Sequence, residues 1–340
     1  EDGIRDIGVT GVQTCALPIS STVLFAISCS KQTPEDAMTN NSTDYAAVGE
    51  SAKGRHCGSY EVLQRQLKED PSLATRMQAI ESLTERVMQN PGQYKLVNGV
   101  IVLPVVVNVL YNTAAQNISL AQIQSQIAVL NADYAGTNSD VALTPAIFQP
   151  VLAGNTKIQF VLDTVIRKST TTSSWSTNDA MKKAPKGIAP TSPTTKLNLW
   201  CCNMGGGILG YAQFPGGSSA TDGVVIDDNA FGNTGSVTAP YDKGRTATHE
   251  VGHWLNLRHI WGDATCGSDL VGDTPLHNAA NYGCPASGHK STCTGTPVEM
   301  TMNYMDYTDD ACMYMFSAGQ NARMQAVFVS GGPRNSFAQP

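Results

Sequence analysis

Three histidines and one glutamate within residues 249–259 have the types and spacing needed for metal-assisted hydrolysis. His249 and His253 are four residues apart, so on a helix both imidazoles project from the same face. This arrangement lets two ring nitrogens bind one Zn²⁺ ion. Glu250 would lie beside the open side of that ion, where it can take a proton from a water molecule whose acidity the metal increases. The pattern therefore predicts zinc-dependent hydrolysis with Glu250 as the base.

A third metal ligand is available at His259, which lies outside the helical register of the first two. It can reach the same ion only if the helix stops and the chain turns sharply near residue 256. Asn256 suits that turn, because Asn is the residue other than Gly that most readily adopts the left-handed conformation at a helix end. The chain has only 6 histidines, and three of them lie in this stretch. We therefore expect a helix over residues 243–255, followed by a turn that returns His259.

Residues 249–262 resemble the zinc-binding motif of the metzincin metallopeptidases, in particular the bacterial, ulilysin-like branch of the pappalysin family. Asn256 stands where most metzincins have Gly. Residues 302–307 (Met-Asn-Tyr-Met-Asp-Tyr) resemble the family's Met-turn. The resemblance implies that Met305 lies beneath the zinc site and that Tyr307 stabilises the oxyanion during catalysis. A core role for Tyr307 is the alternative.

The resemblance covers roughly residues 98–330 and implies an α/β (α+β) fold. The expected catalytic domain, residues 96–340, has a twisted, mostly parallel sheet with backing and active-site helices above a loop-rich, disulfide-bonded lower part. A length of 340 residues, 41% hydrophobic and 15% charged, suits one sizeable core with a smaller accessory region. The net charge of −6 argues against nucleic acid as the main partner.

The first 54 residues predict export rather than folded structure. Residues 1–19 resemble a translated sequencing adapter, so residues 1–28 are interpreted as that artefact plus the remnant of a secretory signal. Cys29 resembles the lipidated cysteine of a bacterial lipoprotein; ordinary signal cleavage and a buried strand are the alternatives. Residues 29–54 are polar and predict a linker. We expect an extracellular, periplasmic or cell-surface protein whose membrane contact is a lipid at Cys29.

Residues 55–95 predict a helical segment that carries a single cysteine, Cys57. Apolar residues recur at helical spacing on both sides of Pro71. The segment resembles the pro-segment of bacterial pappalysins, which implies that Cys57 binds zinc and keeps the enzyme latent. The chemistry is sensible, because thiolate is a strong zinc ligand. A structural thiol is the alternative.

The remaining pattern predicts the elements that position the zinc motif. Pro104 removes one donor from an otherwise β-branched strand, so that part should be an edge or a bulge. The cleft-bordering strand, which in metzincins runs antiparallel to bound substrate, is assigned to residues near 208–214. The expected strands are 100–110, 157–165, 197–203, 211–215 and 223–227. Helices are expected to begin after Ser119 and after Ser317, and the second should end near residue 329. Residues 168–195 are expected to form a surface loop.

Four cysteines crowd into the loop-rich residues 266–312, where disulfides are typical of exported proteins. Four cysteines allow three pairings, and a second structural zinc site is a further alternative. The family resemblance implies the pairs Cys266–Cys293 and Cys284–Cys312. Cys201 and Cys202 have no role that the sequence indicates.

The same loop contains Asp269, Gly272 and Thr274, whose oxygens the resemblance implies as calcium ligands, Gly272 through its carbonyl. A solvated acidic turn is the alternative. Asp309 and Asp310 follow the Met-turn, and a carboxylate there would favour a basic residue just after the scissile bond. An acidic turn without such a role is equally consistent with these residues.

We conclude from the sequence that the protein is a secreted zinc endopeptidase made as a latent zymogen. Its expected cofactors are Zn²⁺ and Ca²⁺, and its partners are protein or peptide substrates and its own pro-segment. The alternative is a non-catalytic, zinc-stabilised binding or adhesion module. Glu250 distinguishes the two, because a structural zinc site needs no base.

Overall fold

The computed structural model describes residues 54–90, 93 and 99–338. The adapter-like stretch, Cys29 and the polar linker therefore lie outside the described residues. The described residues all fall within one compact unit. Its helices are α2 (Ser59–Glu69), α3 (Ser72–Gln89), α4 (Leu120–Ala135), α5 (Arg245–Trp254) and α6 (Ala318–Ala326), and its strands are β1 (Ile101–Tyr111), β2 (Ile158–Ser169), β3 (Leu197–Cys202), β4 (Gly210–Ala212) and β5 (Val224–Asp227).

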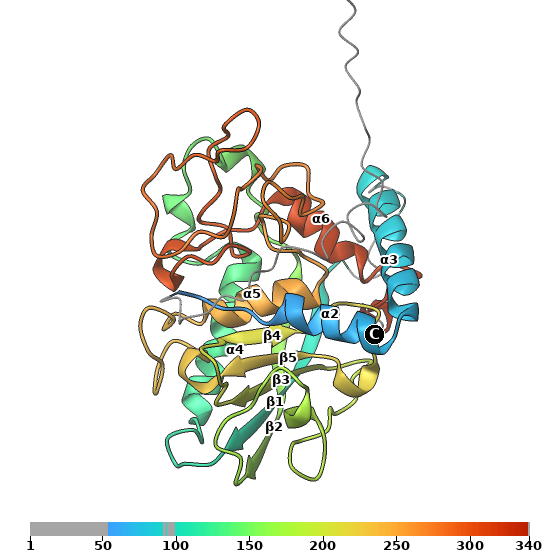
Figure 1. Cartoon of the computed structure of the whole chain (residues 1–340), viewed down its shortest axis with the longest axis vertical. Helices are drawn as coiled ribbons and strands as arrows, with labels where there is room; N and C mark the ends of the chain where they lie inside the picture. Colours follow the sequence, from blue (N-terminus) through green and yellow to red (C-terminus); the bar gives the residue numbers. More distant parts are fainter. Residues whose placement is uncertain (1–53, 91–92, 94–98, 339–340) are drawn as a thin grey trace, which may run out of the picture. The chain divides into compact units, whose positions relative to one another are not determined.

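The five strands form one sheet in the order β2-β1-β3-β5-β4 (Figure 1). Strand β1 pairs in parallel with β2 and β3, and β3 pairs in parallel with β5. Only β4, at one edge, runs antiparallel to its neighbour β5. This arrangement confirms the predicted α/β fold with a mostly parallel sheet.

Pro104 lies in β1 at the place where a missing N–H group does least harm. Pairing between β1 and β3 begins at Val105, so Pro104 faces only β2. The register between β1 and β2 then shifts between Val105 and Val106. The expectation of an edge or a bulge is therefore confirmed on both counts.

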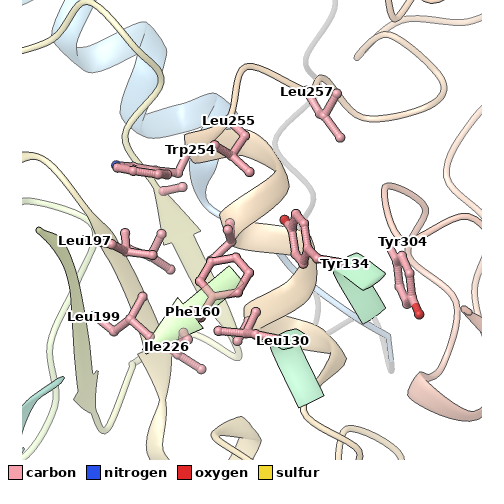
Figure 2. Close-up of a cluster of buried hydrophobic side chains, with 14 of the residues drawn as sticks. Leu130, Tyr134, Phe160, Leu197, Leu199, Ile226, Trp254, Leu255, Leu257 and Tyr304 are labelled. Carbon is pink, nitrogen blue, oxygen red and sulfur yellow. The ribbon is translucent and has the colours of Figure 1, made fainter. Parts of the chain in front are cut away.

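Helices α4 and α5 cover one face of the sheet and bury the main hydrophobic core between them. Figure 2 shows Leu130 and Tyr134 of α4 packed with Phe160 of β2. Ile123, Ile127, Leu130 and Tyr134 recur at helical spacing along α4 and are all buried. Helix α4 begins at Ser119, whose side chain accepts a hydrogen bond from the Gln122 N–H group. The core therefore packs against α5, the helix that carries the first two histidines.

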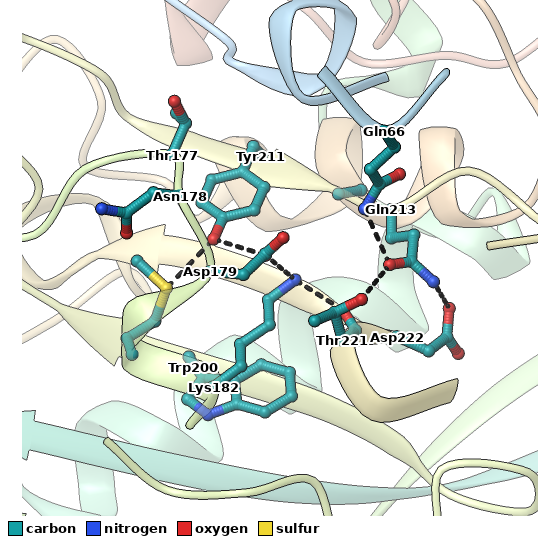
Figure 3. Close-up of polar contacts among 12 residues, drawn as sticks. Gln66, Thr177, Asn178, Asp179, Lys182, Trp200, Tyr211, Gln213, Thr221 and Asp222 are labelled. Atoms are coloured by element: carbon teal, nitrogen blue, oxygen red, sulfur yellow. Dashed lines mark hydrogen bonds and ion pairs between the residues drawn. The ribbon is translucent and has the colours of Figure 1, made fainter. Parts of the chain in front are cut away.

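The opposite face of the sheet is covered by the long loop over residues 168–195. We expected this loop on the surface, but it also contributes buried side chains such as Met181 and Lys182. The Lys182 ammonium lies 2.9 Å from Asp179 Oδ1 and 2.7 Å from the Thr221 carbonyl. Figure 3 shows these contacts. Tyr211 of β4 donates a 2.9 Å hydrogen bond to the same Asp179 carboxylate. The loop thus fixes β4, the strand that borders the active site.

Two helices of the predicted pro-segment pack against the catalytic part of the chain. Helix α2 lies beside β4, and α3 lies beside α6 (Figure 1). Gln66 of α2 donates a 2.9 Å hydrogen bond to Gln213 (Figure 3). Glu81 of α3 forms a buried, bidentate ion pair with Arg323 of α6. Within the described residues, no helix is long and apolar enough to cross a membrane.

The C-terminal part is rich in loops and contains both predicted disulfides, Cys266–Cys293 and Cys284–Cys312. The alternative of a second zinc site at these cysteines is therefore wrong. Helix α6 begins after Ser317, as expected, where Ser317 and Gln320 form a capping box, but it ends at Ala326, earlier than we expected. Cys201 and Cys202 are buried free thiols rather than a disulfide.

Candidate active site

The turn after α5 brings the third histidine back to the first two. Helix α5 ends at Trp254, and Asn256 adopts the left-handed conformation with φ 73°. The Leu257 N–H group then donates to the Gly252 carbonyl at 2.9 Å, which closes the turn. This geometry is the one that the spacing of the histidines required.

The three imidazoles meet at one buried point together with the Cys57 thiol. His253 Nε2 lies 3.1 Å from both His249 Nε2 and His259 Nε2. One ligand atom from each of the four residues lies within 4.8 Å of all the others. Burial lowers the pKa of His249 and His253, which keeps their nitrogens neutral and able to bind a cation. Three nitrogens and one sulfur are a suitable tetrahedral donor set for Zn²⁺.

Each imidazole is oriented by a hydrogen bond from its other ring nitrogen. His249 Nδ1 lies 2.6 Å from the Tyr304 carbonyl, and His253 Nδ1 lies 2.8 Å from the Leu257 carbonyl. His259 Nδ1 lies 2.5 Å from Asp263 Oδ1. These acceptors place the proton on Nδ1 and leave Nε2 free for a metal.

Glu250 points into the same buried space and is 1% exposed. Its Oε2 accepts hydrogen bonds from the Cys57 thiol at 3.2 Å and from the Ser59 hydroxyl at 2.9 Å. Ser59 in turn accepts a 2.8 Å hydrogen bond from the Ala212 N–H group of β4. Burial raises the pKa of Glu250 to about 7. A carboxyl group with a pKa near neutrality is suited to both taking and giving a proton.

Residues 56–58 cross the site beside β4 and pair with it through an isolated β-bridge. Gly58 N donates to the Gly210 carbonyl at 2.8 Å, and Leu209 N donates to the His56 carbonyl at 2.9 Å. The bridge between Cys57 and Gly210 is parallel. This segment therefore runs parallel to β4, which is the reverse of the antiparallel direction expected for bound substrate.

Tyr307 contacts the backbone of Cys57 with its hydroxyl group. The hydroxyl donates to the Cys57 carbonyl at 3.2 Å and lies 3.3 Å from the Cys57 N–H group. The Tyr307 ring also packs edge-on against His259. The ring thus belongs to the main hydrophobic core, as the alternative had it, while the hydroxyl reaches the site.

Met305 lies beneath the metal-binding residues and is fully buried. A Cβ atom at Gly252 would lie only 2.5 Å from Met305 Sδ, so the helix has Gly where the Met-turn approaches it. The Met305 carbonyl also accepts a 3.1 Å hydrogen bond from Ile260, next to His259. The Met-turn thus supports both the helix and the third histidine.

Of the two acidic residues after the Met-turn, Asp310 is buried at the site. Its Oδ1 forms a 2.5 Å ion pair with Arg55, whose Nη1 donates to Thr246 at 3.0 Å. Its Oδ2 accepts from the Lys243 and Arg245 N–H groups at the start of α5, at 2.8 and 3.2 Å. Asp309 is partly exposed, and its N–H group donates to the Gly283 carbonyl.

The proposed calcium loop is held by its own hydrogen bonds. The Thr274 hydroxyl lies 2.9 Å from both oxygens of Asp269, and Asp269 Oδ1 also accepts from Val271 N at 3.1 Å. Asp269 is only 4% exposed, so the solvated turn that was the alternative does not describe this carboxylate. Burial raises the pKa of Asp269 to about 6.

Four residues at the site were not singled out from the sequence. Arg55 and Ser59 flank Cys57, and only the fold shows which catalytic residues they contact. Asp263 lies four residues after His259, a spacing that a search for acceptors near each ligand could have found. Gly252 lies between the residues that define the motif, and its importance depends on the distant Met305.

The fold and the site together define a zinc metalloendopeptidase of the metzincin type. Residues 209–329 match the family model described as pregnancy-associated plasma protein-A, peptidase M43. An extracellular metalloprotease of Pyricularia oryzae is 36% identical over 225 residues, covering 64% of this chain and 70% of that protein. An extracellular metalloprotease of Verticillium alfalfae is 33% identical, covering 67% of this chain and 78% of that protein.

Two solved structures from Tannerella forsythia are more similar in sequence. Mature mirolysin in complex with a cleaved peptide is 48% identical with a TM-score of 0.68, covering 70% of this chain and 95% of that one. A promirolysin mutant is 43% identical with a TM-score of 0.76, covering 83% of this chain and 97% of that one. The chain belongs to the pappalysin family, as the sequence motifs indicated.

Proposed function

We propose that the protein is an exported zinc endopeptidase whose pro-segment blocks the metal through Cys57 and whose cleft favours a basic residue after the scissile bond. The observation that carries the proposal is the convergence of three imidazoles and Glu250 at one buried point. Family membership supports zinc-dependent hydrolysis of peptide bonds and synthesis in a pro-form.

His249, His253 and His259 would hold the zinc ion, which supplies Lewis-acid polarisation of the scissile carbonyl. Glu250 takes a proton from the attacking water and passes it to the leaving amine. The Tyr307 hydroxyl donates a hydrogen bond to the carbonyl oxygen as negative charge develops there. Support for this role is its present contact with a backbone carbonyl, that of Cys57, at 3.2 Å.

Latency is proposed to depend on Cys57 and the direction of its segment. Cys57 Sγ lies among the imidazoles and 3.2 Å from Glu250 Oε2. With zinc bound, the sulfur would be a thiolate in the place of the attacking water, and Glu250 could hold the proton that the thiol loses. The parallel pairing with β4 reverses the chain relative to the antiparallel substrates of metzincins. A reversed peptide does not present its carbonyl in the orientation that the metal and Glu250 require.

We expect Cys57→Ala to shorten the lag before the intact chain becomes active. Ser59→Ala is the matched control variant, because it removes a hydrogen bond to Glu250 but leaves the thiol. The measurement is the appearance of peptidase activity and of the processed chain over time. A Cys57→Ala chain that stays latent as long as the parent would show that α2 and α3 close the cleft without the thiol.

The specificity proposal rests on Arg55. Because the pro-segment runs in reverse, the residues before Cys57 lie on the side where substrate residues after the scissile bond would bind. There Arg55 pairs with Asp310, a fully buried carboxylate held by two backbone N–H groups. Removal of the pro-segment leaves this carboxylate without its cation. An Arg or Lys side chain of the substrate can then replace Arg55.

Two fluorogenic peptides that differ only by Arg or Leu after the scissile bond test this preference. The mature enzyme is expected to cleave the Arg peptide with a kcat/KM higher by at least about 10-fold, the scale of one charged contact of about 1.5–3 kcal/mol. Asp310→Asn should reduce the preference, and Asp309→Asn is the control that should retain it. Equal kcat/KM values for the two peptides in the wild type would rule the proposal out.

Export is supported by the names of the relatives, which are extracellular metalloproteases. A lipid at Cys29 remains part of the proposal, and mass analysis of the mature N-terminus in a bacterial host tests it. Calcium binding by Asp269, the Gly272 carbonyl and Thr274 is also proposed. The structure supports this calcium site only through the buried carboxylate of Asp269, and a Ca²⁺ ion would need 6–8 oxygen ligands in total. A calcium titration that leaves thermal stability unchanged would reject it.

The alternative of a non-catalytic binding module predicts a permanent four-ligand zinc site. Cys57 does complete such a set in this structure. It comes, however, from the part of the chain that resembles a removable pro-segment, and Glu250 has no task in a structural site. Both points favour the enzyme.

A further inference from the structure

Helix α3 covers a strip of the catalytic part of the chain that becomes free when the pro-segment leaves. This α3-binding strip consists of Phe214, Gly216, Arg323, Ala326 and Val329. It extends from the segment after β4 to the end of α6, beside which α3 lies (Figure 1). Four apolar residues of α3 pack against its apolar members, namely Leu73, Met77, Leu83 and Val87.

Arg323 is the charged member of the strip and is 1% exposed. Its two terminal nitrogens hold the Glu81 carboxylate in a bidentate pair, and its Nε donates to the Asn256 carbonyl at 2.7 Å. Among the described residues, Glu81 is the only carboxylate that pairs with this guanidinium. The Asn256 carbonyl belongs to the catalytic part, so it keeps the guanidinium oriented after Glu81 has left. An oriented guanidinium is suited to bind another carboxylate in the same way.

A second cation, Arg258, acts on the same carboxylate. Burial raises the pKa of Glu81, but the charge and hydrogen bonds of Arg323 and the charge of Arg258 outweigh burial and hold that pKa below its ordinary value. Arg258 and Arg323 also repel each other, whereas Asp263 and Asp269 attract Arg258. When α3 leaves, both guanidinium groups lose the carboxylate that they share. The strip then combines apolar side chains with positive charge that Glu81 no longer neutralises.

The strip continues the active-site cleft. Phe214 follows β4 closely, and α2 runs beside β4 from Cys57 toward α3. Because the pro-segment runs in reverse relative to substrate, the residues after Cys57 lie on the side where substrate residues before the scissile bond would bind. A protein substrate that leaves the cleft on this side therefore meets the strip.

We propose that the α3-binding strip of the mature enzyme is an exosite for protein substrates. It binds an amphipathic helix that presents a carboxylate between aliphatic residues and precedes the scissile bond. This inference rests on the proposed function, because the strip is free only once the pro-segment has been removed. The exosite contacts none of the reacting groups, so it should lower KM and leave kcat unchanged.

The test compares two fluorogenic substrates of the mature, zinc-loaded enzyme by their initial rates. The short substrate is the cleaved sequence alone, and the long substrate has residues 70–90 of this chain added before it through a Gly/Ser linker. A linker of about 20 residues spans roughly 25 Å. That is about the length of the 18-residue helix α3, so the linker can return from the far end of the strip to the cleft. We expect a KM for the long substrate that is lower by at least about 5-fold, with the same kcat.

Variants of the added helix locate the contact on the substrate. Glu81→Gln in this helix should remove most of the gain in KM, because an amide cannot form the bidentate ion pair. Glu85→Gln, at an exposed position of the same helix, is the matched control and should keep the gain. An excess of the free helix should abolish the advantage of the long substrate without inhibiting cleavage of the short one.

A variant of the enzyme locates the contact on the strip. Val329→Asp should bring the KM of the long substrate close to that of the short one, and Ser330→Asp, on the exposed neighbouring residue, is its control. If Val329→Asp does not fold, the helix variants decide with the wild-type enzyme. Equal KM values for the two substrates, a gain that survives Glu81→Gln or Val329→Asp, or inhibition of the short substrate by the free helix would overturn the exosite. A mature enzyme that does not cleave even the short substrate would instead refute the proposed function, and the exosite with it.

Discussion

The active site has two sides that are held in different ways. On the imidazole side, the three histidines are oriented by Tyr304, Leu257 and Asp263, all of them in the catalytic part of the chain. On the thiol side, Cys57 is held by backbone pairing with β4 and by Tyr307. These contacts cross between the pro-segment and the catalytic part, whereas the Ser59 N–H group, which donates to Cys57 Sγ at 3.4 Å, lies within the pro-segment.

This difference separates the contacts that hold the metal site from the contacts that hold the pro-segment in the cleft. The contacts of the imidazoles can remain when the pro-segment is removed, so the metal site is built to survive activation. The contacts of Cys57 and Arg55 are broken in the same event. Latency and metal binding can therefore be changed independently by substitution, and the predictions below test that independence.

The largest expected effect is on turnover. Glu250→Gln keeps the shape of the side chain but cannot accept a proton, so kcat of the mature enzyme should fall roughly 10²–10⁴-fold. Zinc content should stay the same, because Glu250 is not one of the clustered ligands. Metal analysis and peptide assays on the same sample check both parts. Loss of zinc in this variant would place Glu250 among the ligands and contradict the separation.

The next effect concerns the far end of the pro-segment, where Glu81 pairs with Arg323. Both residues are buried, and Arg323 Nε also holds the Asn256 carbonyl at 2.7 Å, within the turn that returns His259. Glu81→Gln should lower the free energy of unfolding of the intact chain by about 3 kcal/mol, because it leaves a buried cation unpaired. Glu85→Gln, on an exposed residue of the same helix, is the control. Equal denaturant midpoints for the two variants would show that this ion pair does not anchor the pro-segment.

On the imidazole side, Asp263→Asn should weaken zinc binding by about 10–100-fold. The reason is that Asp263 accepts the Nδ1 proton of His259 and orients the ring. Competition with a chelator measures the affinity, in both the intact and the mature forms. An affinity that falls only in the intact form would mean that the imidazole side depends on the pro-segment after all.

The smallest effect is a shift in pH dependence. Burial raises the pKa of Glu250 to about 7 in the latent form, and removal of the pro-segment exposes the carboxyl group to water. Removal also takes away the Cys57 and Ser59 hydrogen bonds and the charge of Arg55, which lower this pKa, but burial is the largest cause. Exposure should therefore dominate, so the pKa falls and the base is ionised at lower pH. The acid limb of kcat/KM against pH for the mature enzyme should therefore lie below pH 7. A limb at or above pH 7 would indicate that other groups keep Glu250 shielded.

The sequence predicted the histidine array well, because helical spacing and one left-handed residue determine it locally. The strands and the helix after Ser119 followed from local composition and spacing for the same reason, whereas the parallel sheet was implied by the family resemblance. The contacts between Arg55 and Asp310 and between Glu81 and Arg323 could not be predicted, since each joins residues more than 240 positions apart. Of the two neighbouring aspartates, only the turn geometry determines that Asp310 points inward.

The composition of residues 168–195 predicted a surface loop, but part of this loop is buried. Its Ser, Thr, Lys and Pro content is typical of an exposed loop, yet Lys182 is 1% exposed. Asp179 on the same loop supplies the charge that makes this burial possible. A composition average cannot show such a pairing, because it depends on which two residues of the loop face the sheet.

Zinc X-ray absorption on the same preparation, before and after removal of the pro-segment, distinguishes the thiol side from the imidazole side. We expect one sulfur at about 2.3 Å and three nitrogens at about 2.0–2.1 Å in the intact chain. After removal, the sulfur should disappear while the three nitrogens remain. A zinc ion with only nitrogen and oxygen neighbours in the intact chain would contradict the role of Cys57, and a loss of histidine nitrogens on activation would contradict the separation of the two sides.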